Sequence, residues 1–178
     1  MSSLKINHNC HICDGRENYS ALSIIAENIV VIAQFVLAAT LMRNFWLFNF
    51  PLLTIAFIVY CLVMLGYVLR RHLCSHCYYY DKWCHCGWGK PAALVVKKSE
   101  TPMPTKSKLA SFFWFSVLVL PIFTFILSLI LNLTTFRTEL PYLLSFTLTL
   151  VISGAMHVRD CKECKMRLVC PGSAAKKE

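Results

Sequence analysis

The chain alternates between long apolar runs and shorter polar segments. The apolar runs cover about residues 21–42, 50–69, 109–133 and 140–158. Each is close to the roughly 20 residues that an α-helix needs to cross about 30 Å of hydrocarbon, at a rise of about 1.5 Å per residue. Four such runs in a chain of 178 residues leave too little polar sequence to cover them in water. The pattern therefore predicts an all-α membrane protein built as a four-helix transmembrane bundle.

Two short links and one long loop group the four spans into two hairpins. The division has five parts, which are an N-terminal cysteine knuckle at 1–20, transmembrane hairpin 1 at 21–69, a Cys/His-rich loop and linker at 70–108, transmembrane hairpin 2 at 109–158 and a C-terminal cysteine motif at 159–178. The first, third and fifth parts must share one side of the membrane. There they are expected to form a small cysteine-rich cap.

Composition agrees with a membrane protein. Hydrophobic residues make up 57% of the chain and charged residues only 15%, whereas an ordinary soluble domain is about half apolar and one quarter charged. The formal net charge is +9, which on its own would be compatible with nucleic-acid binding. The distribution of the cations gives a different explanation.

Sixteen of the 18 Lys and Arg residues fall on the cap side, and only Arg43 and Arg137 fall in the links on the other side. Such an asymmetry is typical of the positive-inside rule, so we expect the cap and both termini to be cytoplasmic. Orientation and contact with lipid headgroups account for the cations. The expected partner is therefore the lipid bilayer and not nucleic acid.

Nine of the ten cysteines lie in the predicted cap. They are Cys10, Cys13, Cys74, Cys77, Cys84, Cys86, Cys161, Cys164 and Cys170. A reducing cytoplasm argues against structural disulfides and favours metal or redox chemistry. A two-residue spacing lets both thiolates of a pair face one ion, and a glycine that follows lets the backbone turn tightly.

Each hairpin is followed by three cysteines that need a fourth ligand. Cys86 can complete the set in the central loop, and either Cys10 or Cys13 can complete the set at the C-terminus. This pairing predicts about two zinc sites, since zinc prefers closed tetrahedral sites with such ligands. Iron–sulfur clusters, which also take four cysteines, are the alternative. Thiol chemistry without a metal is a third interpretation of these cysteines.

Polar residues are rare inside the spans. Glu27 and Gln34 lie seven residues apart on one face of the first span, and an ionisable group inside a span is by default a functional hypothesis. We therefore single out these two residues as a possible intramembrane polar site. The alternative is that Glu27 reaches the membrane edge or pairs with Arg70, Arg71 or His157.

The order of parts resembles the DHHC protein acyltransferases, which also place a cysteine-rich cytoplasmic loop between the second and third of four spans. This chain has no Asp-His-His-Cys motif, so the resemblance implies no catalytic residue. The segments Cys74-x2-Cys77, Gly87-x-Gly89-Lys90 and Cys161-x2-Cys164 resemble those of small four-span membrane proteins of prokaryotes. That resemblance implies a prokaryotic plasma membrane but no particular activity.

Three classes of function remain open. The favoured one is an integral membrane metal-binding protein, stabilised by zinc, that serves as an accessory or binding subunit of a membrane complex. The alternative is an iron–sulfur subunit that transfers electrons. A membrane enzyme that uses a cytoplasmic thiol is the third, although no set of residues typical of a catalytic site stands out.

Overall fold

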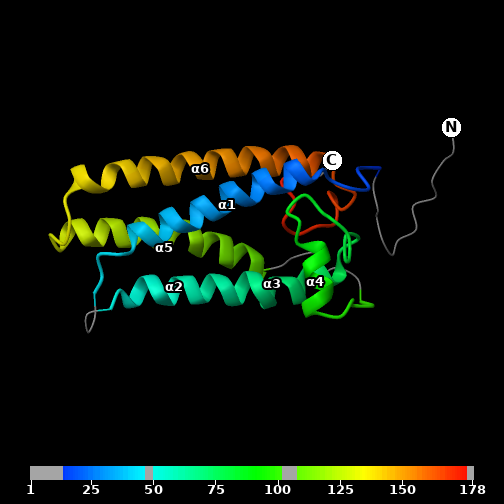
Figure 1. Ribbon diagram of the computed structural model, residues 1–178, viewed down its shortest axis with the longest axis horizontal. Helices are drawn as coiled ribbons and strands as arrows, with labels where there is room; N and C mark the ends of the chain where they lie inside the picture. Colours follow the sequence, from blue (N-terminus) through cyan, green and yellow to red (C-terminus); the bar gives the residue numbers. More distant parts are fainter. Residues whose placement is uncertain (1–13, 47–49, 102–107, 176–178) are drawn as a thin grey trace.

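The computed structural model describes residues 14–46, 50–101 and 108–175, and these are helical with no β-strand among them. The long helices run side by side along one axis (Figure 1). They are α1 (Ala21–Leu41), α2 (Leu52–Val63), α5 (Lys108–Ile130) and α6 (Phe136–Lys162). The all-helical, four-span architecture expected from the apolar runs is confirmed.

The second span is longer than the apolar run that predicted it. Helix α2 continues through a π-helical segment, Met64–Val68, into α3 (Leu69–His72) and ends in a 3-10 turn. The whole span of 25 residues, Leu52–His76, and the three other long helices are long and apolar enough to cross a membrane. The added residues include Arg70 and Arg71, whose positive charge is favourable near the negative end of a helix dipole.

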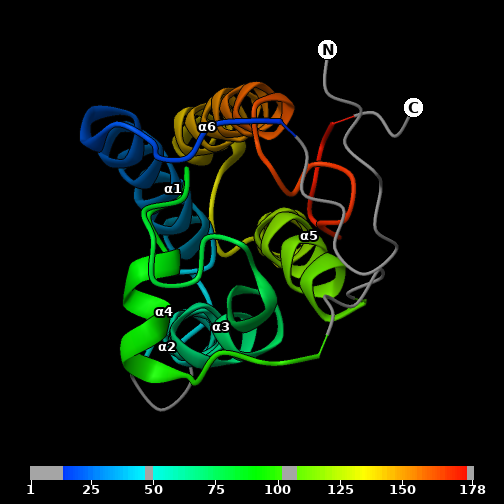
Figure 2. The ribbon, with the colours of Figure 1, turned by 90° about the vertical axis from the view of Figure 1, so that its right-hand side faces the viewer.

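Burial in α1 is the reverse of that in a soluble protein. Its polar residues Glu27 and Gln34 are 6% and 3% exposed, whereas Leu22, Ile29 and Ile32 are more than half exposed. The end-on view shows α1 lying along α6, with α5 and α2 completing the bundle (Figure 2). Apolar side chains that face outward on a helix with a polar inner face indicate a lipid environment.

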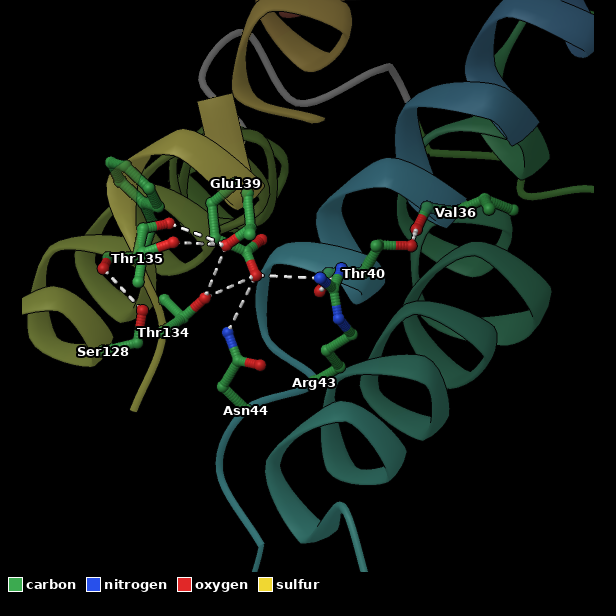
Figure 3. Close-up of polar contacts among 10 residues, drawn as sticks. Val36, Thr40, Arg43, Asn44, Ser128, Thr134, Thr135 and Glu139 are labelled. Atoms are coloured by element: carbon green, nitrogen blue, oxygen red, sulfur yellow. Dashed lines mark hydrogen bonds and ion pairs between the residues drawn. The ribbon is translucent and has the colours of Figure 1, made fainter. Parts of the chain in front are cut away.

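An ion pair joins the two short links at the end opposite the cap (Figure 3). Glu139 is 1% exposed, and its Oε1 accepts hydrogen bonds from Arg43 Nη2 at 2.8 Å, Asn44 Nδ2 at 3.2 Å and Thr134 Oγ1 at 3.0 Å. The Arg43 guanidinium also lies over the ring of Tyr142. This outer ion pair therefore ties hairpin 1 to hairpin 2.

The cap brings together three segments that are distant in sequence. The Arg16 backbone N–H donates to Glu163 O at 2.9 Å, and the Arg16 and Glu163 side chains pair at 2.6 Å. Tyr79 of the central loop, 1% exposed, donates from its hydroxyl to Arg16 O at 2.5 Å. The short helix α4 (Gly89–Val95) crosses this end nearly perpendicular to the long helices (Figure 1).

Candidate metal centre

Helix α1 places Glu27 inside the bundle near the cap. The Ser20 side chain accepts a hydrogen bond from Ser23 N at 3.2 Å and starts the helix at Ala21. Glu27 then falls in the second turn, about 9 Å along the axis from Ala21. A carboxylate buried at this depth is costly unless it is partnered.

The central loop supplies its partners by docking on α1. Asn28 Nδ2 donates to Cys86 O at 3.0 Å, and the Trp88 indole N–H donates to Asn28 Oδ1 at 3.3 Å. Gly87 between them has φ +73°, and a Cβ there would lie 2.5 Å from Ile24 Cγ2. The loop can therefore turn sharply against α1, with His85 and Cys86 on the side of Glu27. The tight turn expected after Cys84-His85-Cys86 is present.

Glu27, His85 and Cys86 form a triad of potential metal ligands. One donor atom from each lies within 4.8 Å of the other two. Glu27 Oε1 is 3.9 Å from His85 Nε2 and 3.7 Å from Cys86 Sγ. Both ring nitrogens of His85, and Glu27 Oε2, are buried without a hydrogen-bond partner. Such atoms are costly in a folded protein, and a bound cation would satisfy them.

The surroundings keep His85 in the form that binds metals. Burial and, to a smaller extent, the charge of His157 lower the pKa of His85 to about 4, although Asp160 acts in the opposite direction. A neutral imidazole at physiological pH has a lone pair free for an ion. His157 and Asp160 therefore both influence the protonation of His85.

Helix α6 contributes His157 and Asp160 to the same region. The His157 ring lies 5.5 Å from the His85 ring, and its Nε2 is 2.8 Å from Gly172 O and 3.5 Å from Cys161 Sγ. Asp160 is 2% exposed, and its Oδ2 is buried without a hydrogen-bond partner. The triad is thus bordered by a second buried carboxylate.

Cys84 and Cys86 differ in their protonation. A hydrogen bond from the Cys86 thiol, together with the backbone N–H groups of Gly89, Trp88 and Cys86, lowers the pKa of Cys84 to about 6. The pKa of Cys86 is raised by that hydrogen bond, by burial and by Glu27. The lowered pKa favours the thiolate form of Cys84, and metal binding by Cys86 would release the proton of Cys86.

Four of the described cap cysteines gather around Tyr79 without forming an equally close group. Cys77, Cys84, Cys164 and Cys170 belong to one cluster with this ring. Burial raises the pKa of Cys77 and Cys170, and that of Cys164 to about 11. Within the described residues, no three thiols approach one another as closely as the triad does.

The two four-cysteine sites therefore stay predictions. Cys10 and Cys13 lie outside the described residues. Arg16, a few positions later, contacts Glu163 beside Cys164, which is the neighbourhood in which the N-terminal pair was expected to act. Cys74 and Cys161 lie at the cap ends of their spans.

The sequence identified Glu27 and named His157, which lies beside His85, as a possible partner, but it did not connect Glu27 with His85 or Cys86. Gln34 is buried on the same face, two turns deeper, and is not part of the triad. Arg70 donates to Leu65 O and Pro91 O, and Arg71 donates to Tyr67, so neither contact involves Glu27. His85 had been visible only as part of a cysteine motif.

Replacement of Gly87 by Ala should undock the loop from α1. The added Cβ would both disfavour a φ of +73° and clash with Ile24, so we expect a loss of about 1–3 kcal/mol in stability. Hydrogen exchange of the amides of residues 84–88 measures this directly. Gly66→Ala is the control, because a Cβ at that position meets nothing within 4 Å. Equal protection in both variants would contradict the docking.

No known family model, curated protein or solved structure matches this chain. Its function is therefore inferred from the residues of the site and from their place in the membrane bundle.

Proposed function

We propose that this protein is an integral membrane metal-binding protein and that the Glu27–His85–Cys86 triad holds a zinc ion. The observation that carries the proposal is the convergence of three potential ligands, of which Glu27 Oε2 and both ring nitrogens of His85 are buried without a hydrogen-bond partner. A carboxylate, an imidazole and a thiolate are all ligands that zinc accepts. A structural role for these atoms as ordinary packing would leave their burial unexplained.

Three protein ligands leave a fourth zinc position. Asp160 is the candidate for it, because its Oδ2 is also buried without a partner and its charge acts on the pKa of His85. Its carboxylate lies outside the 4.8 Å group and its Oδ1 pairs with Arg159, so it would have to move toward the ion. Water would leave the site open, as in catalytic zinc sites, whereas Asp160 would close it, as in structural ones. We favour the closed form.

A closed site would connect α1, the central loop and α6. The cap consists of short segments that cannot bury a large core, and metal binding can supply the folding energy that such segments lack. We therefore propose a structural ion that shapes the cap as the surface of an accessory or binding subunit in a membrane complex. The predicted four-cysteine sites would add further zinc to the same cap.

Anaerobic purification followed by metal analysis and absorption spectroscopy tests this function. We expect near-colourless protein with at least one zinc per chain. Brown protein with iron and acid-labile sulfide would replace the proposal with the iron–sulfur alternative. Protein free of any metal after purification without chelators, and unable to take up zinc, would contradict both.

The cation asymmetry supports a cytoplasmic position of the cap as part of this proposal. A cysteine introduced at Asn44, in the link on the opposite side, should react with a membrane-impermeant thiol reagent applied to intact cells. The native cap cysteines should be protected until the cells are opened. Labelling of Cys164 or Cys170 from outside would reverse the orientation.

A further inference from the structure

An open pocket lies at the cap end of the second span, and none of the triad residues lines it. Its volume is about 520 Å3, and its basic lining residues are Arg71, His72, His76 and Lys97. None of its lining residues is acidic. Among the described residues, no carboxylate forms a salt bridge with Arg71 or Lys97. The two permanent cations of this basic pocket, Arg71 and Lys97, therefore have no salt-bridge partner among the described residues.

The walls of the basic pocket are held by their own contacts. Arg71 Nη1 donates to the Tyr67 hydroxyl at 2.8 Å, and His76 Nε2 lies 3.1 Å from Thr101 Oγ1. The Ser99 backbone N–H donates to Ser75 O at 3.0 Å and fixes the segment that carries Lys97. The cations are thus brought together by tertiary structure.

The position of the pocket along the second span corresponds to the level of the lipid headgroups. Arg71 lies 19 residues beyond the start of the span at Leu52, or about 28 Å along a helix, which is close to the roughly 30 Å thickness of the hydrocarbon core. Nearby α4 runs across the bundle (Figure 1) and exposes 89% of Leu94 and 46% of Val95. A short helix with exposed apolar residues beside lysines is typical of a membrane interface.

We propose that the basic pocket binds the phosphate group of an anionic phospholipid from the leaflet on the cap side. Basic pockets beside transmembrane helices are a common means of binding anionic headgroups. Arg71 and Lys97 would contact the phosphate, while exposed Leu94 and Val95 on α4 would lie near the acyl chains. A soluble phosphate compound offers the same headgroup chemistry but has no acyl chains to contact the exposed Leu94 and Val95.

Native mass spectrometry of the full chain in detergent tests the proposal. We expect phosphatidylglycerol to remain bound and phosphatidylcholine to bind more weakly. The double variant Arg71→Gln/Lys97→Gln should lower phosphatidylglycerol affinity by about tenfold or more, since each cation near an anionic surface contributes about 1 kcal/mol. The control Lys90→Gln/Lys98→Gln removes two exposed cap-side lysines outside the pocket lining, and should change the affinity much less.

A folding control and a soluble competitor complete the binding experiment. An unchanged helical circular dichroism spectrum shows that the double variant is folded. Glycerol 1-phosphate, which carries the headgroup chemistry without acyl chains, should compete poorly. Equal binding of both lipids, or equal losses in the two double variants, would overturn the proposal. Competition by glycerol 1-phosphate as strong as that by phosphatidylglycerol would overturn the lipid as its source.

Discussion

Glu27→Gln should remove about one metal ion per chain. The amide keeps the size of the carboxylate but loses the negative charge that would hold a cation next to His85 and Cys86. Loss of an outer-shell partner typically lowers metal affinity by about 10–100-fold, so loss of a ligand should exceed that. Titration with zinc against a competing chelator measures the change. His85→Ala should have an effect of the same size.

Gln34→Ala is the matched control for that experiment. Gln34 is a buried polar residue on the same helix and the same face, but it lies two turns from the triad. Its replacement should leave the zinc content unchanged. Equal losses in Glu27→Gln and Gln34→Ala would show that any damage to the polar face of α1 releases the metal, and would contradict a triad site.

Arg43→Ala should destabilise the bundle more than any replacement of an exposed cation. It would leave Glu139, which is 1% exposed, without its charged partner (Figure 3). Breaking a buried pair costs about 3–5 kcal/mol. Because the Arg43 side chain is 38% exposed, water offsets part of this, and we expect about 2–3 kcal/mol. Thermal unfolding in detergent, followed by circular dichroism, should show a melting temperature lower by roughly 5–10 °C.

Two variants show whether charge is the cause. Arg137→Ala removes the other cation of the same side, which is exposed, and should change the melting temperature little. Adding Glu139→Gln to Arg43→Ala should recover part of the loss, since no buried charge would then remain unpaired. A double variant less stable than Arg43→Ala would show that Glu139 acts chiefly through Asn44 and Thr134.

The membrane spans could be predicted because bilayer thickness is a physical constraint that the sequence must meet. Their ends were less predictable. The second span continues to His76, and α6 continues to Lys162. Basic residues are favourable in the last turn of a helix, so their appearance after an apolar run does not mark the end of the helix. Apolar content alone marks the part of a helix that lies in lipid, not the whole helix.

The Glu27–His85–Cys86 triad could not be predicted from the sequence, because its members are distant along the chain. Glu27 was visible as an acid in an apolar run, but His85 and Cys86 follow it by 58 and 59 positions. Their meeting depends on the left-handed turn at Gly87 and its contact with Ile24, which no spacing rule contains. Local spacing assigned Cys86 to the cysteines of its own loop, and its thiol does interact with Cys84 there, but spacing could not show that the same thiol also faces Glu27.

Asp160 and Arg43 were missed for a related reason. Asp160 stands beside Arg159 in a strongly charged segment, and such a residue normally belongs to a solvated surface. Only its 2% exposure distinguishes it. In the sequence, Arg43 is informative only about membrane orientation, because its partner Glu139 lies 96 residues later. Charge pairs of this kind become visible only when the helices are packed.

The most direct test of the metal site is X-ray absorption at the zinc edge, measured on the native protein and on Glu27→Gln. Zinc–sulfur bonds are about 2.3 Å long and zinc–nitrogen or zinc–oxygen bonds about 2.0–2.2 Å, so the two kinds of ligand separate. Zinc held by Glu27, His85 and Cys86 predicts a native spectrum with a nitrogen and oxygen shell, and the loss of that shell in Glu27→Gln. A sulfur-only spectrum, identical in the two proteins, would place the metal among the cap cysteines and leave the triad without an ion.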